Sequence, residues 1–210
     1  STNFERISWD EALGAVAAKM NTAIDSYGAS SILHTHYSGT LSLIGYAFPN
    51  RLFNHLGASE VDPDSICNAA GHVAWTLQFG NSVKGFDPRT SKDSKCILVW
   101  GANPSHSAPH AHEYWLGEAS ARVIVVDPIR TDTAAMADLH LQPRPGSDAA
   151  LAFSLLHCLQ QSRSFDEEYI GSNTIGFEEI IDDIRRATPS WGEKQTGVPA
   201  ADIERAAVIY

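Results

Sequence analysis

The chain has 210 residues, of which 43% are hydrophobic and 19% are charged, and its formal net charge is −10. This is an ordinary globular composition, and the length suits one large domain or two small ones. The acidic balance argues against binding nucleic acid through its phosphates, because that mode needs clustered Lys and Arg. No apolar run is long enough to span a membrane, and the first residues contain no signal-peptide hydrophobic region.

The first part of the chain predicts helices around one short strand. Ser8 and Glu11 have the spacing of a capping box, in which each residue satisfies a backbone N–H group of the other at the start of a helix. Gly28 is placed to end that helix. In chain order, the predicted elements are a helix ending before Gly28, a strand at 31–36, a helix at 41–56 interrupted near Pro49, a loop at 58–65 and a helix at 73–79.

The second part alternates between strands and helices, which predicts a parallel sheet. The apolar runs 96–100 and 122–126 are separated by a helical stretch, and a weaker strand follows at 137–142. We expect an α/β fold: a parallel Rossmann-like sheet flanked by helices in three layers, with part of a second α/β domain on its N-terminal side. The domain boundary is expected between 66 and 67. Further helices are predicted at 109–120, 148–161, 177–187 and 199–210.

A polar cluster follows each predicted strand of this sheet. Ligands of parallel sheets bind in the crevice beyond the carboxyl ends of the strands, so the clusters should share one edge. Asp127 is placed either to accept hydrogen bonds from a ribose or a guanine, or to cap a turn before Pro128. Asp148 either helps to form an anion site at a helix N-terminus or is a plain N-cap. The clusters are 101–104, 127–131 and 145–148.

The edge does not have the sequence of a common nucleotide site. Neither the Gly-x-Gly-x-x-Gly fingerprint of NAD-binding domains nor a Walker A motif is present. Arg130 and Arg144 add donors that suit a diphosphate, or else they are solvated surface charges. His106, His110 and His112 are close enough in sequence for a metal site. Because no acid or cysteine accompanies them, a loop-to-helix edge with His106 nearest a ligand is favoured.

Cys67 has a setting that differs from the other two cysteines. It follows a loop and precedes a predicted helix, a position that lowers the pKa of a thiol and suits a metal ligand, and His72 lies five residues further on. A buried cysteine and a core histidine are the alternative interpretation, and the residues alone favour it. Cys96 and Cys158 lie in apolar segments and are expected to be buried. Without a Cys-x-x-Cys pair, this chain alone cannot build a four-cysteine zinc site or an iron–sulfur cluster.

Taken in order, four segments of the chain resemble the molybdopterin oxidoreductases of the dimethyl sulfoxide reductase family. This group includes formate dehydrogenases, nitrate reductases and polysulfide or thiosulfate reductases. Each motif is modest alone, but their order and spacing are specific, and the resemblance covers nearly the whole chain. The segments are 4–13, 100–104, 126–134 and 145–151.

The resemblance implies a bis-molybdopterin guanine dinucleotide cofactor that holds molybdenum or tungsten. It makes 67–210 the domain that binds this cofactor, and it makes Cys67 the metal ligand. His72 becomes a candidate proton carrier, although it lies near, not at, the position where formate dehydrogenases carry a histidine. The residues expected to bind the cofactor are Gly101, Asn103, Pro104, His106, Asp127, Pro128, Arg130, Thr131, Gly146 and Asp148.

The resemblance also implies what lies outside this chain. A [4Fe-4S] cluster is expected upstream and a domain for the second pterin downstream, so the chain is expected to be an internal fragment, inactive by itself and folded without cofactor. Expected partners are a small substrate, the remaining domains and an electron-transfer subunit, with neither nucleic acid nor a membrane. A cytoplasmic location is expected, with a periplasmic one left open because a leader would precede Ser1.

Two other hypotheses stay open. The large electron-transfer subunit of respiratory NADH dehydrogenase resembles this fold without molybdenum, so the chain is alternatively a cofactor-free structural relative. The presence of Cys67, Asp127 and the 146–148 loop argues against this. The third hypothesis is a plain nucleotide-binding module, which the missing glycine fingerprint weakens.

Overall fold

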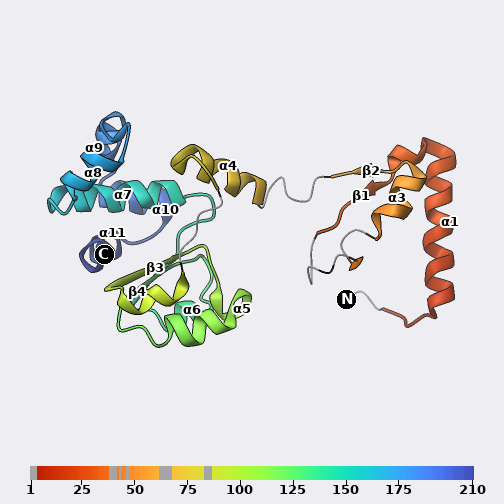
Figure 1. Ribbon diagram of the computed structural model, residues 1–210, viewed down its shortest axis with the longest axis horizontal. Helices are drawn as coiled ribbons and strands as arrows, with labels where there is room; N and C mark the ends of the chain where they lie inside the picture. Colours follow the sequence, from red (N-terminus) through yellow and green to blue (C-terminus); the bar gives the residue numbers. More distant parts are fainter. Residues whose placement is uncertain (1–3, 38–41, 43, 46–47, 62–67, 83–86) are drawn as a thin grey trace. The chain divides into compact units, whose positions relative to one another are not determined.

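The computed structural model describes residues 4–37, 42, 44–45, 48–61, 68–82 and 87–210 (Figure 1). The chain divides into two compact units, 1–85 and 86–210. The predicted boundary between 66 and 67 adjoins residues outside the described ranges, so it stays a prediction.

The first unit begins with helix α1 (Trp9–Tyr27), whose two ends are those predicted from the sequence. Ser8 and Glu11 form the capping box: the Ser8 N–H donates to Glu11 Oε2 at 2.8 Å, and the Glu11 N–H donates to Ser8 Oγ at 3.2 Å. Gly28 ends the helix with a φ of 84°, a conformation that costs other residues energy. Local sequence therefore fixes both ends of α1.

A two-stranded parallel sheet follows in the same unit. Strand β1 (Leu33–His34) pairs with β2 (Ser59–Glu60), and helix α3 (Asn50–Leu56) connects them. Helix α3 begins after Pro49 and ends at Gly57. Strand β2 lies in a segment that we predicted as loop, because two residues are too few to show the alternation that marks a strand. Helix α4 (Asn68–Phe79) contains the helix predicted there.

The second unit is built on a parallel sheet with the order β3-β4-β5. Strands β3 (Cys96–Trp100) and β4 (Arg122–Val126) have the predicted bounds, whereas β5 (Leu139–Leu141) is shorter than predicted. Strand β4 pairs with both neighbours, and its last four residues are buried. A strand paired on both edges and covered on both faces is expected to be almost wholly apolar, as this one is.

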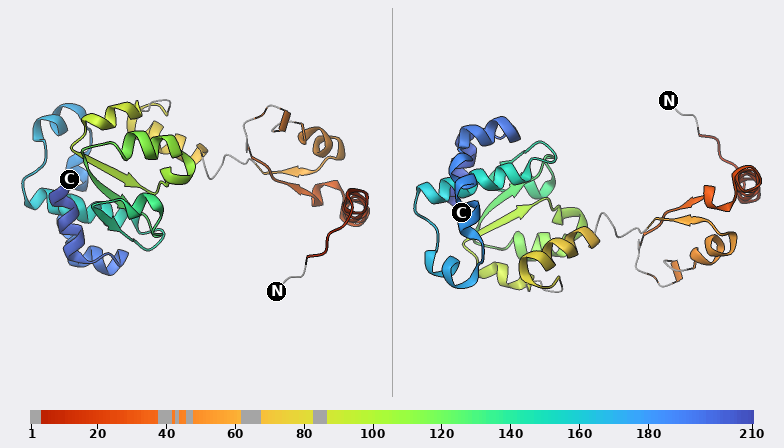
Figure 2. Two further views of the ribbon diagram at one scale, coloured as in Figure 1. Left: turned by 90° about the horizontal axis from the view of Figure 1, so that it is seen from below. Right: turned by 90° about the horizontal axis from the view of Figure 1, so that it is seen from above.

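Helices cover both faces of this sheet, which confirms the three-layer α/β/α architecture (Figure 2). On one face, Ile124 and Leu141 pack with Leu151 and Ile203. On the other, Val125 packs with residues of the β3–β4 and β4–β5 connections. The helical segments are, in chain order, η2 (Pro88–Asp93), α5 (Pro104–Ser107), η3 (Ala111–Leu116), α6 (Asp132–Ala135), α7 (Asp148–Gln161), α8 (Glu167–Asn173), η4 (Phe177–Ile180), α9 (Ile181–Arg186), α10 (Pro189–Thr196) and α11 (Ala200–Ile209).

Gly192 allows α10 to pack closely against α7, and its replacement tests this contact. A Cβ at Gly192 would come closest to Ser154 Oγ and would lie 2.8 Å from Ser154 Cβ and 3.0 Å from Ile203 Cδ1. We expect Gly192→Ala to lower the free energy of unfolding by about 1–3 kcal/mol in urea denaturation, because the core is overpacked. In the control Gly171→Ala, the new Cβ meets nothing within 4 Å, and a gain of about 0.5–1 kcal/mol is expected from helix propensity. A loss of the same size in both variants would contradict the close packing.

Candidate functional site

The three polar clusters begin side by side at the carboxyl ends of the strands. The Gly101 N–H donates to the Val126 carbonyl at 2.9 Å, and the Asp127 N–H donates to the Leu141 carbonyl at 3.1 Å. The indole Nε1 of Trp100 donates to Asp148 Oδ1 at 2.7 Å, which joins the end of β3 to the start of α7. We call this edge, made of 101–106, 127–131 and 145–148, the carboxyl edge.

Two glycines leave the backbone of the carboxyl edge open to a ligand. Gly101 has a φ of +60° and Gly146 a φ of +84°, and a Cβ built at either position meets no atom within 4 Å. Both residues are exposed. The positive φ angles require glycine for conformational reasons, and the open space allows a bound group to approach the main chain closely.

Asn103 is tied to residues of its own loop and of α6. Its Oδ1 accepts hydrogen bonds from Ser105 Oγ at 2.5 Å and from Thr133 Oγ1 at 3.3 Å, and its Nδ2 lies 3.2 Å from His106 Nδ1. The Ser105 N–H donates to Thr133 Oγ1 at 3.1 Å. Asn103 therefore fixes the shape of the loop and holds the exposed His106 ring. Thr133, which is fully buried and links α6 to this network, was not predicted from the sequence as part of the site.

The structure shows one of the two roles that the sequence left open for Asp127, and the other stays a prediction. Its Oδ1 accepts the Ile129 N–H at 2.8 Å, so it does cap the turn. Its Oδ2 accepts no hydrogen bond from any residue that the structure describes, and the side chain is half-buried at the edge. His140 Nε2 donates to the Asp127 carbonyl at 2.8 Å and so steadies the same turn. One carboxylate oxygen thus shapes the loop while the other is available to a ligand.

The remaining residues of the carboxyl edge, and Arg144 next to it, differ in whether their side chains contact other residues of the protein. Thr131 Oγ1 accepts the Ala134 N–H at 3.1 Å and caps α6. Pro128 and Arg130 are exposed, and Arg130 forms no ion pair with the described residues. Arg144 is directed elsewhere: its Nη1 donates to the Lys194 carbonyl at 2.9 Å, at the end of α10. The exposed Arg144 side chain therefore contacts the end of α10.

The residues expected to carry the chemistry are placed less completely. Cys67 lies outside the described residues. His72 is exposed on α4 in the first unit, and the carboxyl edge belongs to the second. The roles of Cys67 and His72 therefore stay predictions.

The other two cysteines are half-buried against the apolar core of the second unit. Burial raises the pKa of the Cys96 thiol, and the Asp138 carboxylate adds to this effect. Burial likewise raises the pKa of the Cys158 thiol, with a further contribution from Glu204. Thiols held in the neutral form are poor metal ligands and poor nucleophiles. Cys96 and Cys158 therefore pack as small apolar side chains.

The ligand atoms of His106, His110 and His112 do not form a group that could hold one metal ion. Among the described residues, the group of three side chains that could hold one metal ion is His34, His36 and Glu60. This group was not predicted from the sequence. Its signal is the His-x-His spacing within the predicted strand at 31–36, because alternate residues of a strand lie on one face.

Comparisons with known proteins agree with the resemblance found in the sequence. A family model described as molybdopterin oxidoreductase matches residues 1–209. Formate dehydrogenase H of Escherichia coli is 30% identical over 98% of this chain, and the probable oxidoreductase YoaE of Bacillus subtilis is 30% identical over 99%. The solved structure of acetylene hydratase from Pelobacter acetylenicus covers 98% of the chain with 28% identity and a TM-score of 0.61.

This similarity concerns only part of each relative. The chain covers 29% of the formate dehydrogenase, 31% of YoaE and 28% of the acetylene hydratase chain. It therefore spans less than a third of the length of these relatives. Within the described ranges, no helix combines the length and the apolar character needed to cross a bilayer.

The network around Asn103 predicts that Thr133 is needed for stability. Thr133→Val keeps the shape of the side chain but leaves the Ser105 N–H and Asn103 Oδ1 without this partner. We expect a loss of about 1–3 kcal/mol in the free energy of unfolding, measured by urea denaturation. The control Thr174→Val removes an exposed hydroxyl that donates to the Ile170 carbonyl, and a change below about 0.5 kcal/mol is expected. An equal loss of unfolding free energy in both variants would show that the buried network stabilises the fold no more than an exposed hydrogen bond does.

Proposed function

Because the chain belongs to the molybdopterin oxidoreductase family, we propose that it forms part of the catalytic subunit of a molybdenum or tungsten enzyme that carries out two-electron chemistry on a small substrate. The observation that carries this proposal is the carboxyl edge. Three polar segments, far apart in sequence, are held together there by hydrogen bonds around two open glycines. Relatives are named for formate, nitrate and acetylene, so the family does not select a substrate.

The chemical groups of the carboxyl edge fit the guanine nucleotide end of a molybdopterin guanine dinucleotide. Asp127 Oδ2 is placed to accept N–H groups of a guanine base, as a half-buried carboxylate can. The open backbone at Gly101 and Gly146 allows a phosphate to approach, and the first N–H groups of α7 favour a negative charge. Asp148 is turned to the Trp100 indole, which keeps one of its carboxylate oxygens engaged.

The bound cofactor would supply the redox chemistry, and the residues of this chain would bind and orient it. We propose Cys67 as the metal ligand, since a thiolate suits a soft, redox-active metal. We propose His72 as a proton carrier, because an imidazole can give and take a proton near neutral pH. The exposed side chain of His72 on α4 is accessible to solvent, as that role requires.

The other parts of the enzyme belong to the same proposal. The cofactor is proposed to be the bis form, with its second pterin held by another part of the complete protein. A [4Fe-4S] cluster in a preceding segment would pass electrons onward to a partner subunit. The 210-residue chain, which spans less than a third of its relatives, is proposed to be inactive by itself.

Direct analysis of the complete protein tests the class of enzyme. We expect molybdenum or tungsten by elemental analysis, and a pair of guanine nucleotides for each metal atom after the cofactor is hydrolysed in acid. A complete protein that contains neither metal nor pterin, under conditions in which other molybdenum enzymes of the same cells are loaded, would favour the cofactor-free structural relative.

Asp127→Asn tests recognition of guanine without disturbing the turn. The variant keeps Oδ1 for the Ile129 N–H but replaces the second acceptor with a donor. A hydrogen bond to a charged group contributes about 1.5–3 kcal/mol, so affinity for the guanine nucleotide should fall about 10- to 100-fold. The control Asp182→Asn changes an exposed carboxylate on α9 and should leave binding unchanged. Unaltered binding in Asp127→Asn would refute the role of Asp127.

Cys67→Ala in the complete protein tests the metal ligand. We expect turnover to be abolished while the pterin content, which depends on the carboxyl edge, is retained. Undiminished activity with full metal content would exclude Cys67 as the ligand.

A further inference from the structure

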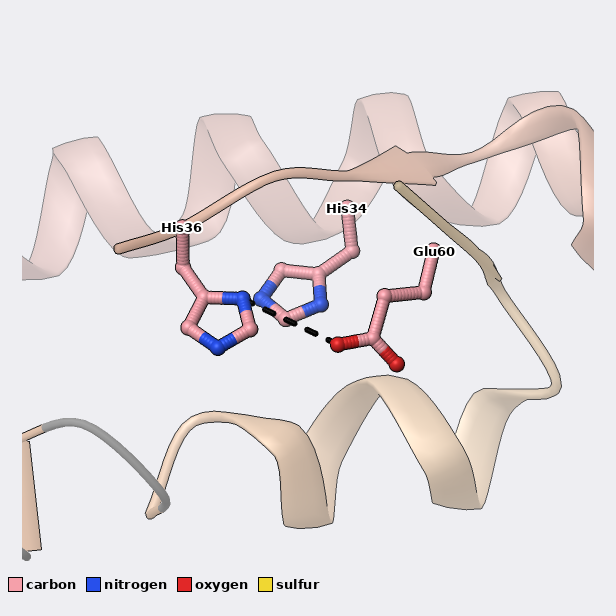
Figure 3. Close-up of side chains that lie close together, drawn as sticks. All are labelled: His34, His36 and Glu60. Carbon is pink, nitrogen blue, oxygen red and sulfur yellow. Dashed lines mark ion pairs between the residues drawn. The ribbon is translucent and has the colours of Figure 1, made fainter. Parts of the chain in front are cut away.

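A second group of potential metal ligands lies in the first unit, and it includes none of the residues assigned to the molybdopterin cofactor. His34 on β1 is the register partner of Glu60 on β2, and His36 follows two residues after His34. The side chains of all three residues lie together between the two strands and α3 (Figure 3). Their ligand atoms lie within 4.8 Å of one another, and His36 Nδ1 is 3.9 Å from Glu60 Oε1. We call this group the two-histidine cluster.

The two-histidine cluster is shielded on one side and open on the other. His34 is only 6% exposed, and its ring stacks on Phe53 of α3 with the ring centroids 4.0 Å apart. The His36 ring stacks on the other face of His34 at 4.6 Å. Glu60 is at the rim, with 46% of its side chain exposed. An ion could therefore enter past Glu60 and reach imidazoles that are largely removed from bulk water.

The described residues of the first unit include no buried apolar side chain that could explain why these polar side chains are brought together. Among its described residues, His34 is the only one that is buried. Its sheet consists of two residue pairs, and a two-stranded sheet of this size is marginal by itself. The His36–Glu60 ion pair, at 3.9 Å, contributes little. Small units without a sufficient core are commonly stabilised by a metal or by packing against another part of the protein.

We propose that His34, His36 and Glu60 bind a divalent transition metal ion, with zinc as the ion that best fits the donor set. Two neutral imidazoles and one carboxylate are a common ligand set for zinc, and they leave a fourth position for water or a small ligand. The ion would link β1 to β2 at the carboxyl end of both strands. This site does not depend on the proposed molybdopterin function, because it shares no residue with the carboxyl edge.

Binding requires a defined rearrangement of the side chains. Zinc–nitrogen and zinc–oxygen bonds of about 2.0–2.2 Å put tetrahedral ligand atoms about 3.3–3.5 Å apart, so the cluster must contract. The His34 and His36 rings are also nearly parallel, at 5°, and an ion cannot lie in the planes of two parallel rings at once. His36 must therefore turn out of the stack, while Phe53 holds His34. Metal binding should consequently shift the ring-proton signals of both histidines.

The test is a titration of the metal-free 210-residue chain with Co²⁺, followed by displacement with Zn²⁺. We expect one equivalent to bind, with the visible absorption of cobalt bound by nitrogen and oxygen and without the charge-transfer band of a thiolate ligand. His36→Gln and Glu60→Gln should each weaken binding by at least about 100-fold. The control His55→Gln removes an exposed histidine of α3 and should bind as the unchanged chain does.

Several results would overturn the proposal. One is that the chain binds no metal at micromolar concentration. Another is that His36→Gln and Glu60→Gln bind metal as tightly as the unchanged chain. The third is that the cobalt complex has a thiolate band that disappears in Cys67→Ser. Glu60 lies at the rim, and glutamine is close in size to histidine and glutamate, so both variants are expected to fold; circular dichroism checks this. If the complete protein contains no pterin, the cobalt titration still gives its own answer, so the two proposals fail separately.

Discussion

The pairing of β4 on both of its edges is the constraint from which the carboxyl edge follows. Val126, the last residue of β4, lies opposite Trp100 on one side and Leu141 on the other. Each strand therefore ends at the same level, and the loops that leave them start side by side. Because Val123 to Val126 are buried on both faces, the strand cannot slip by one residue without exposing its apolar side chains. The core thus sets the register, and the register aligns the loops.

The loops then hold themselves in place through contacts that need no ligand. Asn103 is bound to Ser105 and Thr133, and Asp148 to Trp100. These contacts occupy some of the polar groups that the sequence offered as ligand contacts. The groups left for a cofactor include Asp127 Oδ2, the exposed Arg130 and the open backbone at the two glycines. A site whose loops are shaped before binding loses less entropy when the ligand arrives.

The sequence was most informative where an element is long or strongly apolar. The bounds of β3 and β4 could be predicted because β3 is a run of apolar residues and β4 is such a run after Arg122. Helix α1 carries its own capping box and terminal glycine. Strand β1 was predicted within 31–36, whereas β2 could not be predicted, because two residues show no period and the pairing joins distant segments. Helix α10 was missed, since its Gly192 lowers helix propensity and is explained only by contact with Ser154.

The residues of the candidate site could likewise be predicted from the sequence only in part. Asp127 and Gly101 could be proposed because each directly follows a strand, and Gly146 because it comes just before a predicted helix. Thr133 was missed because its role depends on a loop far away in sequence. The central claim, that the carboxyl edge binds a guanylate group, is tested most directly by amide chemical shifts of the ¹⁵N-labelled chain during titration with guanosine diphosphate. Shifts concentrated at Gly101, at 127–129 and at 146–148, with NAD as a control that leaves them unchanged, are predicted. Shifts elsewhere, or none in the folded chain, would contradict the account.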